Sequence, residues 1–134
     1  SANVNADRWK AMSTEDREAL LWGGSVMTAA TTWNFYSDDS AAVQKSRDLG
    51  IAFHEPTPEL LAAVKEFAAQ DLKTVSGLFK DTYGVERAEE ITAEFAPILE
   101  KWYGLVGDIS SQEELQQLYW DQVLSKVDPA TYGQ

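Results

Sequence analysis

Apolar side chains recur at helical spacing along a proline-free run from Thr14 to Leu49. Ser13 is a favourable N-cap residue, and the acidic residues that follow it complement the helix dipole in the first turn. Gly50 follows Leu49 at the position where a glycine in the left-handed conformation commonly ends a helix. The pattern predicts one long helix over about 14–49, with these apolar positions: Leu20, Leu21, Met27, Ala30, Phe35 and Val43.

Two features inside this run bear on whether the helix is continuous. The pair Gly23-Gly24 costs roughly 1 kcal/mol per glycine relative to alanine in a helix interior, which indicates a bend or a close packing contact. The sequence Asp38-Asp39-Ser40 can cap a new helix, so two helices meeting near Ser37 are the alternative. We favour one long, bent helix.

A short apolar segment, 51–54, follows the long helix and predicts a single strand. A lone strand leaves its backbone donors and acceptors unpaired, so it requires a sheet. No second convincing strand is found elsewhere in the sequence. The expected sheet therefore has to come from another polypeptide or from a longer chain.

Three further periodic segments predict helices over about 58–83, 86–103 and 111–126. Thr57 and Pro58 suit the start of the first of these, and Pro97 predicts a kink or a break in the second. We expect Trp9 and Met12 to pack at the entrance of the long helix. The predicted fold class is mainly α, with four helical segments and one short strand.

Composition indicates an ordinary globular domain, with 44% apolar and 25% charged residues among 134. Eleven basic against 22 acidic residues give a net charge of -11, which disfavours nucleic acid and anionic membrane surfaces as partners. The chain has no cysteine, hence neither disulfides nor thiolate sites. No signal peptide and no membrane span are predicted; the signal of an exported protein would lie outside this sequence.

The residues offer little catalytic chemistry. The single histidine, His54, ends the predicted strand and favours a hydrogen-bonding role over catalysis or ligation. The sequence has no phosphate-binding loop, no dinucleotide-binding glycine motif and no zinc-protease or nucleophile-elbow motif. The adjacent acidic pairs indicate solvated helix faces rather than one metal site. We predict no enzyme activity, no catalytic residue, no metal site and no cofactor.

The aromatic content is high, with five tryptophans and five tyrosines. Such residues can stack on planar ligands or enclose a cation, but Trp9, Trp102 and Trp120 fall where core or subunit packing explains them. Trp22 and Trp33, together with Tyr36, exceed what one apolar stripe needs. They indicate a further packing partner for the long helix.

The order of elements resembles one protein family. Residues 8–17 (RWKAMSTEDR) are similar to the W-x-x-L-(S/P)-x-E-x-(Q/R) entrance to the long C-terminal helix of the periplasmic solute-binding proteins of TRAP transporters, the DctP-type family. Residues 48–57 (DLGIAFHEPT) resemble the family's (L/K)-x-x-G-(V/I)-x-(V/F)-x-x-P passage from helix to strand to helix. Residues 58–67 are similar to the helix that follows, and residues 118–133 to a tail of longer members.

This resemblance implies the C-terminal fragment of a two-domain α/β periplasmic solute-binding fold. The intact protein would bind an organic acid, such as a dicarboxylate, in the periplasm and deliver it to membrane permease subunits. The family's ligand-binding residues would lie upstream of Ser1, so no ligand-binding residue can be assigned in this sequence. We expect the uncovered faces to cause self-association, with 51–54 pairing with its copy. The alternative is a free-standing all-α dimerisation or protein-interaction module.

Overall fold

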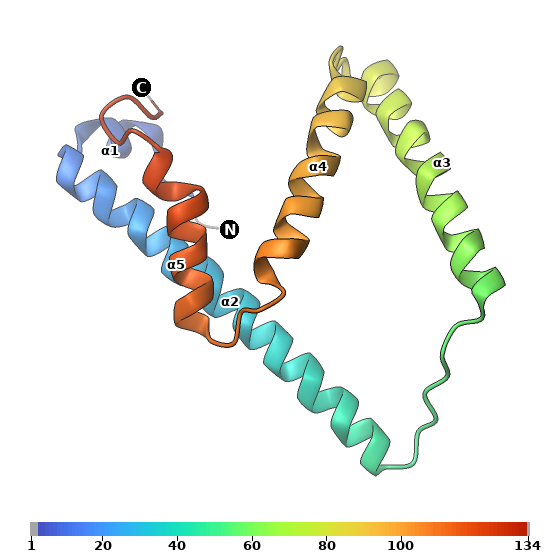
Figure 1. Ribbon diagram of the computed structural model, residues 1–134. Helices are drawn as coiled ribbons and strands as arrows, with labels where there is room; N and C mark the ends of the chain where they lie inside the picture. The colour runs from blue at the N-terminus through green and yellow to red at the C-terminus, as the bar shows by residue number, and fades with distance from the viewer. Residues whose placement is uncertain (1–2, 134) are drawn as a thin grey trace. The chain divides into compact units, whose positions relative to one another are not determined.

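The computed structural model describes residues 3–133, and it is helical without any strand over that range (Figure 1). Five α-helices and one short 3-10 helix are present in this part of the chain. The chain divides into two compact units. The terminal unit joins the residues up to Gly50 with those from Asp108 onward, and the hairpin unit is Ile51–Gly107.

The terminal unit is built on α2, Thr14–Asp48. Helix α5, Gln112–Gln122, packs against α2, followed by the 3-10 helix η1, Leu124–Lys126 (Figure 1). The short helix α1, Ala6–Ala11, precedes α2 in this unit. The side chains buried in this unit are few: Trp9, Arg17, Ser25, Ala29 and Leu115.

Helix α2 begins where the polar pattern predicts. The Ser13 hydroxyl oxygen accepts a hydrogen bond from the Asp16 N–H (3.1 Å) and donates one to the Asp16 carboxylate (2.7 Å). This arrangement satisfies one of the free donors of the first turn. Helix α2 is continuous from Thr14 to Asp48, a range that includes Gly23-Gly24, and its ribbon shows no sharp kink (Figure 1). An ideal Cβ built on Gly24 would lie 3.7 Å from the Leu124 side chain, so this glycine marks a packing contact.

The alternative of two helices near Ser37 is not adopted. The Ser40 hydroxyl donates to the Tyr36 carbonyl at 2.7 Å, which is an intrahelical contact rather than a cap. Phe35 and Tyr36 nevertheless remain mostly exposed. In the terminal unit, the second half of α2 therefore has little packing to hold it.

The hairpin unit contains two helices, α3 (Pro58–Tyr83) and α4 (Ala88–Val106). Thr57 caps α3 by accepting the Leu60 N–H at 3.2 Å, with Pro58 in the first turn. Gly84 ends α3 with φ +68°, a conformation that costs other L-residues steric strain. Pro97 lies inside α4, which continues as one helix through the expected break.

Several sequence expectations are wrong. Residues 51–54 are exposed and form no strand in the part of the chain that the structure describes. A strand needs a neighbouring strand to pair its backbone donors and acceptors, and a local apolar run does not supply one. The all-helical structure therefore contradicts the expected fragment of an α/β solute-binding fold. A further helix, α1, lies before the long helix, where the sequence pattern predicted none.

Candidate protein interface

The hairpin unit leaves most of its large apolar side chains uncovered. Only Ser76 in α3 and Ala88 in α4 are buried, whereas Phe67 is 69% and Phe95 56% exposed. The exposed apolar residues on the two helices are Leu60, Leu61, Val64, Phe67, Leu72, Val75, Leu78, Phe79 and Tyr83 on α3, and Ile91, Phe95, Ile98, Leu99, Tyr103 and Val106 on α4. We call these residues the hairpin face. Exposed large apolar side chains in such number on two adjoining helices favour a protein-binding surface.

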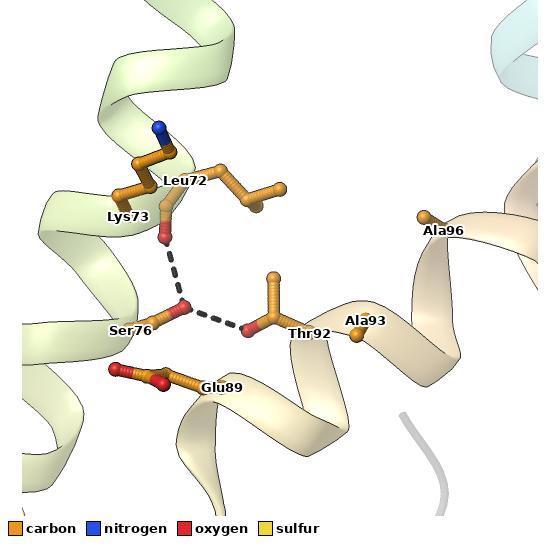
Figure 2. Close-up of a pocket in the computed structure, with 7 residues that line it drawn as sticks. All are labelled: Leu72, Lys73, Ser76, Glu89, Thr92, Ala93 and Ala96. Carbon is orange, nitrogen blue, oxygen red and sulfur yellow. Dashed lines mark hydrogen bonds between the residues drawn. The ribbon is translucent and has the colours of Figure 1, made fainter.

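Small polar residues hold α3 and α4 together (Figure 2). The Ser76 and Thr92 hydroxyl oxygens are 2.9 Å apart. Ser76 also contacts the Leu72 carbonyl (2.9 Å), and Thr92 contacts the Ala88 carbonyl (2.8 Å), each on its own helix. Small side chains at this crossing let the two backbones approach closely.

These two hydroxyls cannot make all three hydrogen bonds at once, because together they carry two hydrogens. When Ser76 donates to the Leu72 carbonyl, Thr92 either donates to Ser76 or to the Ala88 carbonyl. The two hydroxyl hydrogens can therefore be placed in more than one way without moving the oxygen atoms. It links the helices without requiring a large apolar core.

Two shallow grooves flank this contact. One, of about 330 Å³, is almost entirely apolar and is lined by Val75, Ser76, Phe79, Val85, Ala88, Ile91 and Thr92. The other, also about 330 Å³, is lined by Leu72, Lys73, Ser76, Glu89, Thr92, Ala93 and Ala96 (Figure 2). Both belong to the hairpin unit alone. Side chains of another helix or loop could fill them without moving α3 or α4.

The terminal unit holds its elements together differently, through a buried arginine. Arg17 is only 7% exposed, and its guanidinium donates hydrogen bonds to four backbone carbonyls. The acceptors are Trp9 (3.0 Å) and Lys10 (3.0 Å) near the end of α1, and Pro129 (3.1 Å) and Ala130 (3.4 Å) in the C-terminal segment. We call this arrangement the arginine clasp. It satisfies a buried charge and fixes three parts of the chain at once.

Aromatic contacts complete the arginine clasp. The Trp9 indole N–H donates to the Tyr132 carbonyl at 2.7 Å, and the two rings meet edge to face at 6.0 Å. The Arg17 guanidinium carbon lies 5.6 Å from the centre of the Trp9 ring, within range of a cation–π interaction. Gly133, with φ +70°, lies against this indole; a Cβ there would come within 3.1 Å of its nitrogen.

The residues singled out from sequence fall in several places. Trp9 is a core residue, as expected, with 8% of its surface exposed. His54 is exposed in the extended segment, and the acidic pairs are exposed on helices. Sequence reasoning missed both Arg17 and the Ser76–Thr92 contact. A small polar residue set between Val75 and Leu78 in an apolar stripe was the available signal for the latter.

The described residues contain no group of three or more acidic or histidine side chains arranged to hold a metal ion. None of the described helices has the length and apolar character needed to cross a bilayer. No protein-family model, curated protein or solved structure matches the chain. The hairpin face is therefore the candidate functional surface on structural grounds alone.

Proposed function

We propose that the chain is a protein-packing module whose hairpin face binds another polypeptide. The observation that carries this proposal is the exposure of the apolar stripes of α3 and α4 around a nearly coreless contact. Burying apolar surface contributes about 25 cal/mol per Å², so covering these side chains supplies a large driving force for association. In isolation, the module would cover this face with a second copy of itself.

The larger context that we propose is the extracytoplasmic solute receptor of a TRAP-type transporter for organic acids, which would place the chain in the periplasm. The resemblance of residues 8–17, 48–57 and 118–133 to that family supports this context. In it, the hairpin face packs on the remainder of the receptor, and the intact protein passes its ligand to membrane permease subunits. The organic acid would contact residues upstream of Ser1, so this chain alone would not bind it.

A free-standing dimerisation module is the second candidate. It is favoured by the hydrogen bonding of both units, since no buried side-chain nitrogen or oxygen within residues 3–133 lacks a hydrogen-bond partner. The described residues therefore satisfy their buried polar side chains without another polypeptide. A second copy would then cover the exposed apolar side chains of the hairpin face.

Sedimentation analysis of the isolated chain tests the packing module. We expect concentration-dependent association that Phe67→Glu weakens by placing a charge in the hairpin face. The matched control is Phe35→Glu on α2, because Phe35 is exposed to a similar extent, 67% against 69%. A stable monomer in the unchanged protein, or equal effects of both substitutions, would contradict the proposal.

Two measurements separate the receptor from the free-standing module. A native gene product of about 300 residues or more, the size of two domains, supports the receptor, whereas one near the length of this chain supports the module. Calorimetric titration with dicarboxylates, keto acids and sugar acids should show binding to the intact receptor and none to this chain. Micromolar binding by this chain would overturn the receptor assignment.

A further inference from the structure

A second surface, in the terminal unit, combines exposed tryptophan with free carboxylates. The first turns of α2 and the end of α5 form a shallow groove of about 360 Å³. Its lining residues are Glu15, Glu18, Ala19, Trp22 and Trp120. The four α2 residues are spaced at three, four and seven positions, which places them on one face of the helix. We call this the acidic tryptophan groove.

The two indoles meet edge to face, with ring centres 5.1 Å apart and planes inclined by 77°. In an edge-to-face pair, one ring points its edge at the face of the other. The ring that contributes its edge therefore has neither of its own faces covered by the other ring. Trp22 is 39% exposed and Trp120 is partly exposed. The negative face of an indole attracts a cation placed over it.

The carboxylates of Glu15 and Glu18 add charge of the complementary sign. Both side chains are exposed, and within residues 3–133 no ion pair is found at either of them. Arg17 lies between them in sequence, but the arginine clasp directs its guanidinium to backbone carbonyls. Acidic residues in a first turn also complement the helix dipole, but that role does not account for two adjoining indoles.

We propose that the acidic tryptophan groove binds an arginine side chain presented by a basic polypeptide. A guanidinium is planar and weakly hydrated, so it can stack on an indole while its N–H groups donate to a carboxylate. A lysine ammonium lacks the flat face needed for stacking. The net charge of -11 steers such a partner toward the chain at low ionic strength.

Titration with an arginine hexapeptide, followed by the tryptophan indole N–H signals in NMR spectra, tests this proposal. The signals of Trp22 and Trp120 should shift, while that of Trp9, whose N–H is bonded to the Tyr132 carbonyl, should not. A citrulline hexapeptide has the same shape without the charge and should produce no shift. The absence of shifts at Trp22 and Trp120 with millimolar arginine peptide would overturn the proposal.

Paired substitutions distinguish binding at this groove from attraction of the peptide by the net negative charge of the protein. Glu15→Gln with Glu18→Gln should weaken binding roughly fivefold or more. The control, Glu66→Gln with Glu100→Gln in the hairpin unit, changes the net charge equally and should leave affinity within twofold. Equal weakening by both pairs would show attraction to net charge alone and would overturn the site. If arginine binding at this groove is not found, the proposed self-association through the hairpin face is unaffected.

Discussion

The two units of the chain each hold their helices together with few buried side chains, but they use different polar contacts to do so. The terminal unit places a charged side chain inside and surrounds it with backbone carbonyls. The hairpin unit uses two hydroxyls and small side chains, and leaves its large apolar residues outside. The contrast shows that a helix pair can satisfy its polar groups without burying its apolar ones. Both units leave large apolar side chains exposed, and they differ in the polar contact that joins their elements: a buried arginine in the terminal unit and a pair of hydroxyls in the hairpin unit.

The largest expected effect comes from removing the arginine clasp. Arg17→Ala removes the four buried or partly buried hydrogen bonds that the guanidinium donates, and we expect it to lower the unfolding free energy of the terminal unit by about 3 kcal/mol. Urea unfolding followed by tryptophan fluorescence measures this, because four of the five tryptophans lie in that unit. Arg17→Lys should restore only part of the loss, since an ammonium lacks the guanidinium fork.

The matched control for the clasp is an arginine in the hairpin unit. Arg87 pairs with Glu90 (2.7 Å) and Glu94 (3.4 Å), but its side chain is 64% exposed. Because solvent screens such pairs, Arg87→Ala should cost no more than about 0.5 kcal/mol. An equal loss of unfolding free energy on substitution of either arginine would contradict the distinction drawn between the two units.

Two glycines of the hairpin unit should respond with opposite signs. Gly84→Ala places a side chain at φ +68° and should destabilise α3 by about 1 kcal/mol. Gly77→Ala lies within the helix, has open space around its Cβ position and should stabilise α3 by about 0.5–1 kcal/mol. Amide hydrogen exchange along α3 measures the change in helix stability caused by each substitution. Destabilisation by Gly77→Ala would mean that another chain packs closely at that point.

The Ser76–Thr92 contact should contribute a smaller coupling. In a double-mutant cycle with Ser76→Ala and Thr92→Val, we expect an interaction free energy of about 0.5–1 kcal/mol. Exchange protection of α3 and α4 amides in the hairpin unit provides the measurement. Additive effects of the two substitutions would show that close packing alone, without the hydroxyl contact, holds the helices together.

The smallest expected effect is acid sensitivity at the helix starts of both units. The Ser110 N–H (2.8 Å) and hydroxyl (2.9 Å) donate to Glu114 and lower its pKa below the ordinary 4.5. In the hairpin unit, the backbone N–H of Glu59 and the Thr57 hydroxyl lower the pKa of Glu59 in the same way. Because the folded values are lowered, this stabilisation is present above about pH 4.5 and is lost as the pH falls through them.

Carboxyl NMR titration of both glutamates checks this expectation. Ser110→Ala should raise the pKa of Glu114 toward its ordinary value while leaving that of Glu59 unchanged, because it removes one of the donors. An unchanged pKa for Glu114 would indicate that the hydroxyl does not hold the carboxylate in solution. The two helix starts would then differ in a way that the structure does not show.

Local sequence signals predicted the helix caps well. Ser13 and Thr57 each accept a backbone N–H at a helix start, because a short side-chain oxygen meets a free donor within a few residues. The same local reasoning failed at 51–54, where apolar residues predicted a strand. A strand depends on a partner at long range, which no local pattern supplies. It also missed the short helix α1, whose cap at Asn5 carries an equally plain signal.

By itself, the sequence determined that this chain is mainly helical, where its long helices begin, and that large apolar side chains follow α3 and α4 as stripes. These features depend on contacts a few residues apart. Tertiary structure decided that Arg17 reaches carbonyls more than a hundred residues away, that Ser76 meets Thr92, and that the stripes stay uncovered. Such outcomes depend on which distant segments come together, and spacing along the chain does not encode that directly.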